Sequence, residues 1–166
     1  MKMYIKNILI LFFLFTAGTI YVSAQQDSCN VQSYVRADGV MIRGVDFEPI
    51  YIDDTLKVSA AMYAIDKDYF LVVRIQTDRK IANYTKDLAI QLSDSTVILL
   101  SYDSFKSDRS KKTYDGYFKI DSKDLGYIEK YTLVQLKYYI GKDIHTLSVQ
   151  QKFHILQRHF ACLRNT

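Results

Sequence analysis

The sequence has little cysteine, proline and glutamate, and it has no tryptophan. Two of its 166 residues are Cys and one is Pro, and its only glutamates are Glu48 and Glu129. So few glutamates leave little choice for the proton donor of a glycosidase, and the lack of Trp argues against a sugar-stacking platform. Because proline cannot donate to a ladder, Pro49 places residues 47–52 at a sheet edge or in a loop.

Motifs for catalysis and metal binding are also missing. The sequence holds no Gly-x-Ser-x-Gly elbow of the α/β-hydrolase type. On a helix His154 and His159, five positions apart, would diverge by roughly 140°, unlike zinc ligands one turn apart. We expect them and His145 at the surface. The carboxylates at 53–54 and 66–68 lack the spacing of a calcium loop and fit turns. We therefore predict no metal and no cofactor.

Charge of neither sign dominates the chain. It has 22 Lys and Arg against 18 Asp and Glu. A balance so close to neutral gives no electrostatic footprint for nucleic acid. One basic cluster (Lys106, Arg109, Lys111 and Lys112) falls in a polar segment, 104–112, that we expect to be an exposed, mobile loop. A solvated loop explains this cluster better than an anionic partner does.

The first 24 residues predict export. Lys2 and Lys6 form a positive head, and an apolar stretch follows from Ile8 to Val22. That stretch is shorter than the roughly 20 residues of a membrane-spanning helix. Val22-Ser23-Ala24 then supplies the small-residue exit of a signal peptide. We predict a signal peptide over 1–24, one periplasmic or secreted domain over 25–166 and no stable membrane span after cleavage. An uncleaved N-terminal anchor is the alternative.

The two cysteines lie near the two ends of the predicted mature chain. In a compartment that permits oxidation, Cys29 and Cys162 predict a disulfide that ties the termini together. A loop of that length would be stabilised by about 4–5 kcal/mol through lost chain entropy in the unfolded state. The alternatives are two buried thiols or a Cys162 thiolate activated by His159 or His154, and a structural cysteine is favoured over the catalytic one.

Short segments rich in β-branched and aromatic residues predict a mainly β domain. Turn signals at 38–39, 66–68, 93–95 and 141–143 join pairs of these segments into hairpins. The candidate strands are 30–36, 40–43, 47–52, 57–65, 69–76, 88–92, 96–102, 113–120, 132–140 and 144–149. We expect an antiparallel sheet or sandwich of about seven to nine strands.

Two segments have a helical period instead. Asp121 or Ser122 can cap a short helix near 121–131, in which Leu125, Ile128 and Tyr131 share one face. Residues 150–164 predict a C-terminal amphipathic helix, with a stripe formed by Phe153, Leu156, Phe160 and Leu163. A terminal helix packed on the sheet would bring Cys162 toward the strand that follows Cys29.

Tyrosine is the feature that points toward a binding function. The chain has 14 Tyr, and this side chain offers binding surfaces a rigid amphipathic face. We predict binding roles for Tyr114, Tyr117, Tyr138 and Tyr139. Tyr138 and Tyr139 are adjacent, so on a strand they must point to opposite faces. The alternative is that these rings fill a core edge, since strands recruit Tyr in any case.

Four stretches carry a resemblance: the leader ending VSAQQ, the pattern YFLVVRIQ…LAIQLSDSTVILLS, the run YFKIDSKDLGYIEKY followed by LVQLKYY, and the terminal ACL. Together they resemble small exported β-rich proteins of unknown function from Bacteroidetes. The resemblance implies a Gram-negative periplasm or cell surface and a β-sandwich-like fold. It implies no activity and no functional residues.

These observations predict a non-enzymatic exported binding or interaction module of the cell envelope, with a protein or envelope partner. One alternative is a small envelope hydrolase that uses Asp103, Asp115 or Asp121, which requires a pocket with two acids and a raised pKa. The other is a structural subunit of a surface assembly, which requires a contiguous exposed apolar patch.

Overall fold

The structure is a computed structural model that describes residues 30–79 and 86–165. The predicted leader and Cys29 lie outside these residues. Within the two described ranges, none of the helices is long and apolar enough to span a bilayer.

Ten strands of the described chain form one antiparallel sheet, so the mainly β prediction is confirmed. The strands are β1 (Val31–Val35), β2 (Met41–Val45), β3 (Glu48–Ile52), β4 (Leu56–Ile65), β5 (Asp68–Thr77), β6 (Leu88–Leu92), β7 (Val97–Asp108), β8 (Thr113–Ile120), β9 (Leu133–Ile140) and β10 (Asp143–Ser148). Their order across the sheet is β1-β2-β4-β5-β8-β7-β6-β9-β10, and β3 pairs with β4.

The central ladder is the hairpin of β4 and β5, which pair continuously from Leu56 opposite Thr77 to Ile65 opposite Asp68. Alternate residues of both strands enter the core, because successive strand side chains point to opposite faces. Two strands share the outer edge of β4: β2 pairs with its last residues and β3 with its first. Pro49 therefore lies on an edge strand, where its missing N–H leaves the ladder with β4 intact.

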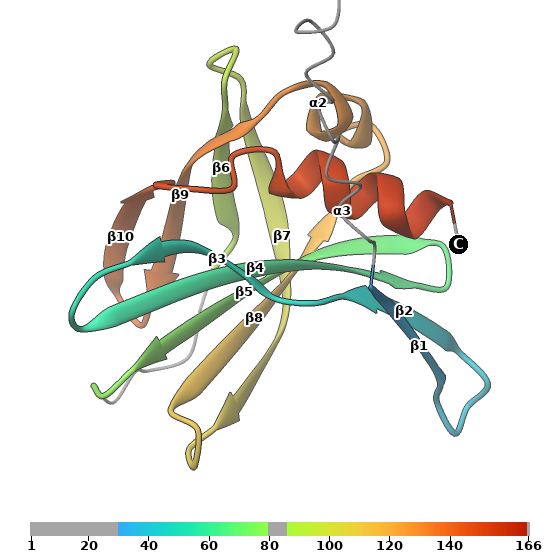
Figure 1. Ribbon diagram of the computed structural model, residues 1–166, viewed down its shortest axis with the longest axis horizontal. Coiled ribbons are helices and arrows are strands. Elements are labelled where there is room, and N and C mark those ends of the chain that lie inside the picture. The colour runs from blue at the N-terminus through green and yellow to red at the C-terminus, as the bar shows by residue number, and fades with distance from the viewer. Residues whose placement is uncertain (1–29, 80–85, 166) are drawn as a thin grey trace, which may run out of the picture.

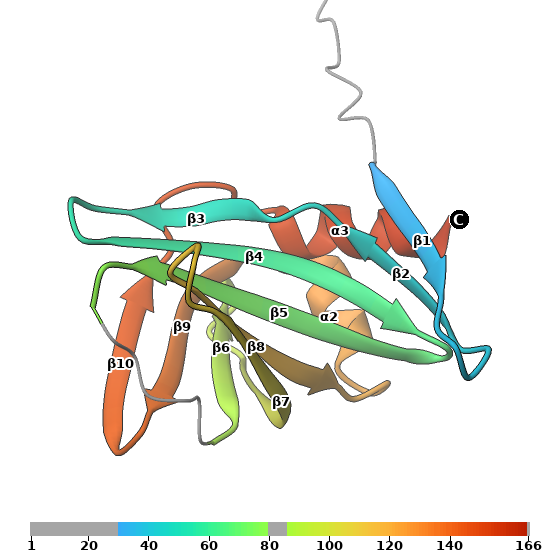
Figure 2. The same ribbon diagram turned by 90° about the horizontal axis from the view of Figure 1, so that it is seen from below.

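Strand β7 bends the sheet. Its first residues pair with β6 and the rest with β8, and the register shifts between Tyr102 and Ser104. As a result β6, β9 and β10 run steeply across β4 and β5, and the two halves of the sheet enclose one core (Figures 1 and 2). The prediction of a loop over 104–112 is wrong for residues 104–108, which belong to β7 and pair with β8. Phe105 of this stretch stacks on Tyr114, with ring centroids 6.4 Å apart.

Two helices of the described chain close the core. The short helix α2 (Leu125–Lys130) buries Ile128, and the C-terminal helix α3 (Ile155–Arg164) packs against β4, β2 and α2. Figure 1 shows α3 lying across the sheet beside α2. Both predicted helices are thus present, but α3 begins at Ile155, so Phe153 lies outside it and is 42% exposed. Each buried Leu or Phe of α3 contributes about 1.5–3 kcal/mol relative to exposure.

Candidate functional site

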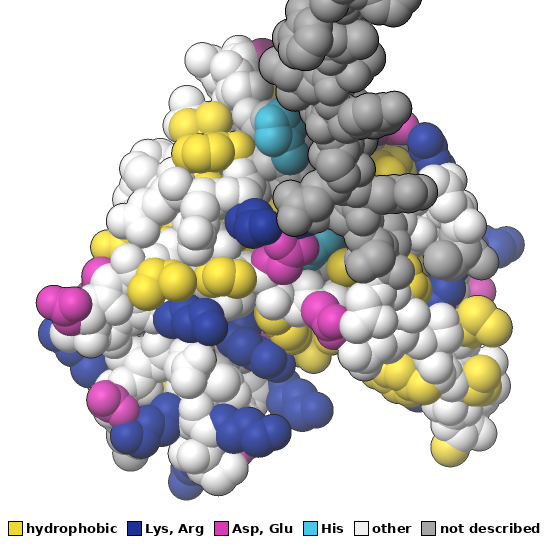
Figure 3. Space-filling view, in the orientation of Figure 1, with side chains coloured by type: hydrophobic (Ala, Val, Ile, Leu, Met, Phe, Trp, Pro, Cys, Tyr) yellow, Lys and Arg dark blue, Asp and Glu magenta, His cyan; other side chains and the backbone are white. Residues whose placement is uncertain are grey.

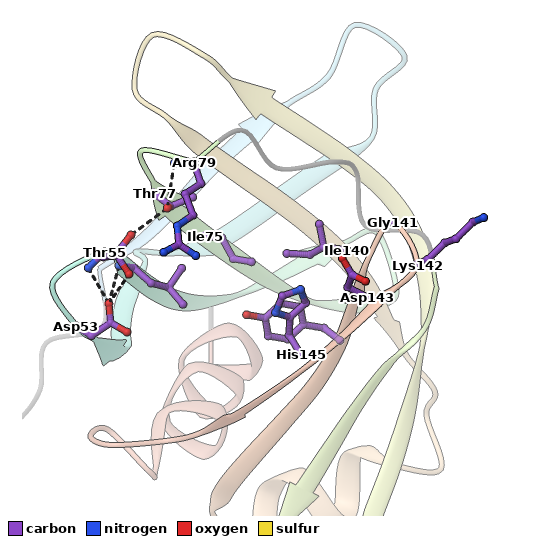
Figure 4. A pocket seen from close by; sticks show the side chains of 12 residues that line it. Asp53, Thr55, Ile75, Thr77, Arg79, Ile140, Gly141, Lys142, Asp143 and His145 are labelled. Carbon is purple, nitrogen blue, oxygen red and sulfur yellow. Dashed lines mark hydrogen bonds between the residues drawn. The ribbon is translucent and has the colours of Figure 1, made fainter.

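A pocket of about 630 Å³ opens where loops from the two halves of the sheet meet; we call it the end pocket. One wall comes from the β3–β4 turn and the ends of β4 and β5, and the other comes from the β9–β10 hairpin (Figure 4). The first wall contributes Asp53, Thr55, Leu56, Ile75, Thr77 and Arg79. The second contributes Tyr138, Ile140, Gly141, Lys142, Asp143 and His145.

Local hydrogen bonds fix the first wall. The carboxylate Oδ1 of Asp53 accepts the backbone N–H groups of Thr55 and Leu56, each at 2.8 Å. The Thr77 hydroxyl donates to the carbonyl oxygen of Thr55 at 2.9 Å and accepts the N–H of Arg79 at 3.3 Å. The Thr55 N–H and the Tyr51 hydroxyl hold the pKa of Asp53 below its usual value. This wall therefore presents an ionised carboxylate on a turn that needs no ligand to form.

The floor of the end pocket is apolar. Ile75 and Tyr138 are buried, and the side chains of Ile75 and Ile140 point toward one another from opposite walls (Figure 4). His145 stacks on Tyr138 with ring centroids 5.4 Å apart. Burial raises the pKa of Tyr138 to about 12, so its hydroxyl stays protonated. Because the charged groups lie at the rim, the pocket is built for a ligand with an apolar body and a polar end.

A second hollow, of about 180 Å³, lies on the face of the sheet that points away from the core; we call it the Arg74 hollow. Leu71, Val73 and Ile75 enter the core, so the intervening Arg74 points to the opposite face. The β1–β2 hairpin forms the other side of the hollow, through Gln32, Tyr34 and Gly44. The end pocket and the Arg74 hollow are therefore separate recesses of the described chain, one between the halves of the sheet and one outside them.

The four tyrosines predicted to bind are not brought together. Tyr117 lines the Arg74 hollow and Tyr138 lines the end pocket. Tyr114 packs on Phe105 at the edge of the core. Tyr139 is half-buried, with the Lys86 ammonium 4.7 Å from its ring centroid. A binding role for the four stays a prediction. Residues such as Asp53, Ile140 and His145 were missed, because no local pattern in the sequence links them to the end pocket.

The three candidate acids of a hydrolase do not form a catalytic pair. Asp103 is exposed in the bulge of β7, Asp121 lies 3.5 Å from Lys123, and Asp115 is ion-paired with Arg74. None of them lines the end pocket. Wherever the pKa of a described carboxylate departs from its ordinary value, it is lowered; these groups are Asp38, Glu48, Asp53, Asp78, Asp94 and Asp108. Residues 30–79 and 86–165 also contain no group of three His, Cys, Asp or Glu placed to hold a metal ion.

The C-terminal helix carries His159 and Cys162, both almost fully buried. The expectation of a surface position is wrong for His159, since Glu48 on β3 gives its ring a charged partner inside the fold. Cys162 is 3% exposed, and its predicted partner Cys29 lies outside the described residues. The chain just after Cys29 enters β1, which pairs with β2, and α3 packs on β2. The described neighbours of both cysteines thus lie in one region, and the disulfide stays a prediction.

An exposed apolar patch is the feature expected of an assembly subunit. On the outer face of the β6–β10 half, Val97 is 63% exposed, Leu99 62% and Ile144 53%. The pairing register places Leu99 in one row with Ala89, Lys137 and Thr146. Val97 lies in a row with Gln91 and Gln135, and Ile144 pairs with Tyr139. The apolar surface is therefore interrupted rather than contiguous.

Comparison of the chain with protein-family models, with curated proteins and with solved structures finds no match. The two recesses are therefore interpreted from their own geometry.

Proposed function

We propose that this chain is a non-enzymatic binding module exported to the cell envelope, and that the end pocket binds a small amphiphilic ligand. One observation carries the proposal: a recess of about 630 Å³ with an apolar floor and a charged rim, held by two separate elements of the fold. Small-molecule sites usually measure about 300–1,000 Å³ and combine these two features.

The floor supplies the affinity and the rim supplies the orientation. Contact with Leu56, Ile75 and Ile140 would remove apolar ligand surface from water, worth about 25 cal/mol per Å². Arg79 offers donors to a polar head group, while Asp53 and Asp143 offer acceptors. A ligand with an apolar body and an anionic or hydroxylated head fits this distribution.

Binding fits the described residues better than hydrolysis does. A hydrolase built on carboxylates needs one protonated acid and one ionised acid facing the same substrate. The acids that line the end pocket, Asp53 and Asp143, stand on opposite walls, and the pKa of Asp53 is lowered. The end pocket therefore lacks the pair of one protonated and one ionised acid that such a hydrolase needs.

Export is supported by the charged head, the short apolar stretch and the small-residue exit of the first 24 residues. Purification of the chain from its native host followed by intact-mass measurement tests this part of the proposal. We expect a mature N-terminus at Gln25 and recovery with envelope or medium fractions. A chain that begins at Met1 and fractionates with cytosol would exclude the proposed location.

The binding function is tested with 1-anilinonaphthalene-8-sulfonate, an amphiphile whose fluorescence rises in apolar pockets. We expect saturable binding to the full domain, and Ile140→Trp should weaken it roughly tenfold by filling the pocket. Ile144→Trp is the matched control, because this residue lies on the same hairpin with its side chain 53% exposed. Absence of saturable binding, or equal weakening by both variants at unchanged thermal stability, would exclude the end pocket.

A further inference from the structure

We propose that the Arg74 hollow is a second binding site and that it takes one ring of a neutral, hydroxyl-rich ligand, that is, a sugar unit. Figure 3 shows the surface hollowed between the β1–β2 hairpin and the body of the sheet, with basic side chains on the side of β7 and β8. This site is separate from the end pocket and does not depend on the function proposed for it.

The guanidinium group of Arg74 is positioned before any ligand arrives. Its Nε and Nη2 atoms each donate to Asp115 at 2.7 Å, in a two-pronged ion pair. The ring of Phe47 covers one face of the group, with 3.7 Å between Arg74 Cζ and the ring centroid. Within the described chain Nη1 has no hydrogen-bond partner. A donor held on two sides with one edge free loses little entropy on binding.

Burial differs between the two partners of this ion pair. The Asp115 side chain is 8% exposed, whereas that of Arg74 is 34% exposed. The carboxylate therefore lies beneath the sheet surface, and the guanidinium lies between it and solvent. Apolar residues would join β5 to β8 at least as well, since ion pairs at buried positions add little net stability. This layering is the one expected when a supporting group orients a binding group.

The charges around the hollow favour a neutral ligand. Arg74 and Lys106 supply two positive charges, and Asp115 and Asp46 supply two negative charges. Asp46 already accepts the side-chain amides of Asn30 at 2.6 Å and Gln32 at 2.9 Å, and an ionised carboxylate has further lone pairs. A phosphate or carboxylate would gain no net electrostatic attraction from such a balance of charges. Hydroxyl groups, which both donate and accept, can use every polar group present.

Aromatic rings supply the remaining surface. Phe47, Tyr63 and Tyr117 form a chain of ring contacts with centroids 6.4 Å and 6.2 Å apart. Burial and the neighbouring Asp115 raise the pKa of Tyr117 to about 12, so its hydroxyl remains a donor as well as an acceptor. Tyr34, 55% exposed, borders the opening. These rings provide apolar faces on which the C–H groups of a sugar can pack. The lack of Trp had argued against a sugar-stacking surface, and Phe and Tyr supply one here.

The volume limits what enters. At about 180 Å³ the hollow is smaller than a complete small-molecule site, for which about 300–1,000 Å³ is usual. It therefore holds one ring of a longer ligand, with the neighbouring rings outside in solvent.

The test is isothermal titration calorimetry of the full domain with three neutral trisaccharides (maltotriose, cellotriose and triacetylchitotriose) and two anionic probes (trigalacturonic acid and inorganic phosphate). We expect at least one neutral trisaccharide to bind with a Kd of about 1 mM or tighter and more tightly than either anion. Binding of none of the neutral sugars, or tighter binding of an anion, would overturn the proposal.

Variants locate the site. Tyr34→Ala should weaken sugar binding by roughly tenfold, because it removes an aromatic face at the opening. Tyr127→Ala is the matched control, an exposed tyrosine on α2 at 46% exposure, and it should leave the affinity unchanged. Equal effects of the two variants would place any sugar binding elsewhere. Ile140→Trp should weaken dye binding in the end pocket and leave sugar binding unchanged, which separates this proposal from the first.

Discussion

The Nε2 atom of His159 lies 2.8 Å from Oε1 of Glu48, a contact that joins the C-terminal helix to strand β3 across 111 positions of the sequence. The imidazole is 1% exposed, and its Nδ1 atom is buried without a hydrogen-bond partner in the described chain. The same carboxylate also meets the side chains of Arg158 and Lys152. One glutamate therefore anchors the middle of α3 and the segment just before it.

Stability should fall as pH is lowered below about 6.5. Burial lowers the pKa of His159, against the opposing influence of Glu48, so the folded state keeps a neutral ring while the unfolded chain takes up a proton near pH 6.5. The unfolded state then binds more protons, and the free energy of unfolding decreases with falling pH by up to about 1.4 kcal/mol per pH unit. Urea unfolding measured between pH 7.5 and 5.5 checks this dependence.

Protonation of Glu48 should extend the loss of stability to lower pH. Burial alone would raise its pKa, but the hydrogen bond from His159 and the charge of Arg158 outweigh burial and lower it. The stability that it contributes is complete above pH 4.5 and disappears as the carboxylate protonates in the folded state. His159→Gln should flatten the dependence between pH 7.5 and 5.5, whereas His145→Gln, at an exposed position, should preserve it. Parallel curves for the wild type and His159→Gln would contradict the assignment to His159.

Two glycine substitutions should have opposite effects on stability. A Cβ atom at Gly44 would lie 2.6 Å from Cε1 of Tyr63, so Gly44→Ala must displace that ring and should cost about 1–3 kcal/mol. A Cβ atom at Gly126 meets nothing within 4 Å, and this residue lies in helix α2. Gly126→Ala should therefore stabilise the fold by about 0.5–1 kcal/mol. Thermal and urea unfolding of both variants check the signs of these changes. If Gly44→Ala leaves the free energy of unfolding unchanged, the Tyr63 ring can move aside from residue 44 without cost.

The hairpins could be predicted because their turn chemistry is local. Gly39 and Gly141 have positive φ angles of 84° and 60°, and Asp66 adopts 55° in the turn between β4 and β5. The order of the hairpins in the sheet could not be predicted, because contacts such as Tyr69 opposite Ile120 join segments far apart in the sequence. The switch of β7 between β6 and β8 was missed for the same reason, since polar residues on an exposed strand resemble a loop.

The two recesses were less predictable than the fold. Tyr117 and Tyr138 were selected for their residue type, and each lines one recess. Nothing local links Asp53 to Ile140, or Gly44 to Arg74, because each pair meets only after the sheet has curled or the β1–β2 hairpin has paired with β4. Arg74 occupies a strand position between buried neighbours, where sequence alone indicates only a charged residue in an apolar run.

Removal of one partner of the Arg74–Asp115 ion pair should cost more than removal of both. Asp115→Ala leaves a half-buried guanidinium without its carboxylate and should destabilise the domain by about 2–4 kcal/mol. The double variant Arg74→Met/Asp115→Leu replaces the pair with apolar side chains of similar length and should recover most of that loss. Urea unfolding gives both values, and a double variant as unstable as Asp115→Ala would show that the pair itself holds β5 to β8.

The predicted disulfide links stability to redox state. If Cys29 and Cys162 are joined, reduction of the native protein should raise its mass by one hydrogen for each cysteine and lower the free energy of unfolding by up to about 4–5 kcal/mol. Cys162 is 3% exposed on α3, so alkylation without denaturant should be slow in either state. Alkylation in denaturant with and without reductant therefore counts the thiols. Cys29→Ser should be as unstable as the reduced wild type, because Cys29 has no other cysteine partner in the sequence. Two alkylated thiols in the unreduced, denatured protein would exclude the crosslink, and the helix would then be held by its buried face and by its contacts with Glu48 and Glu129.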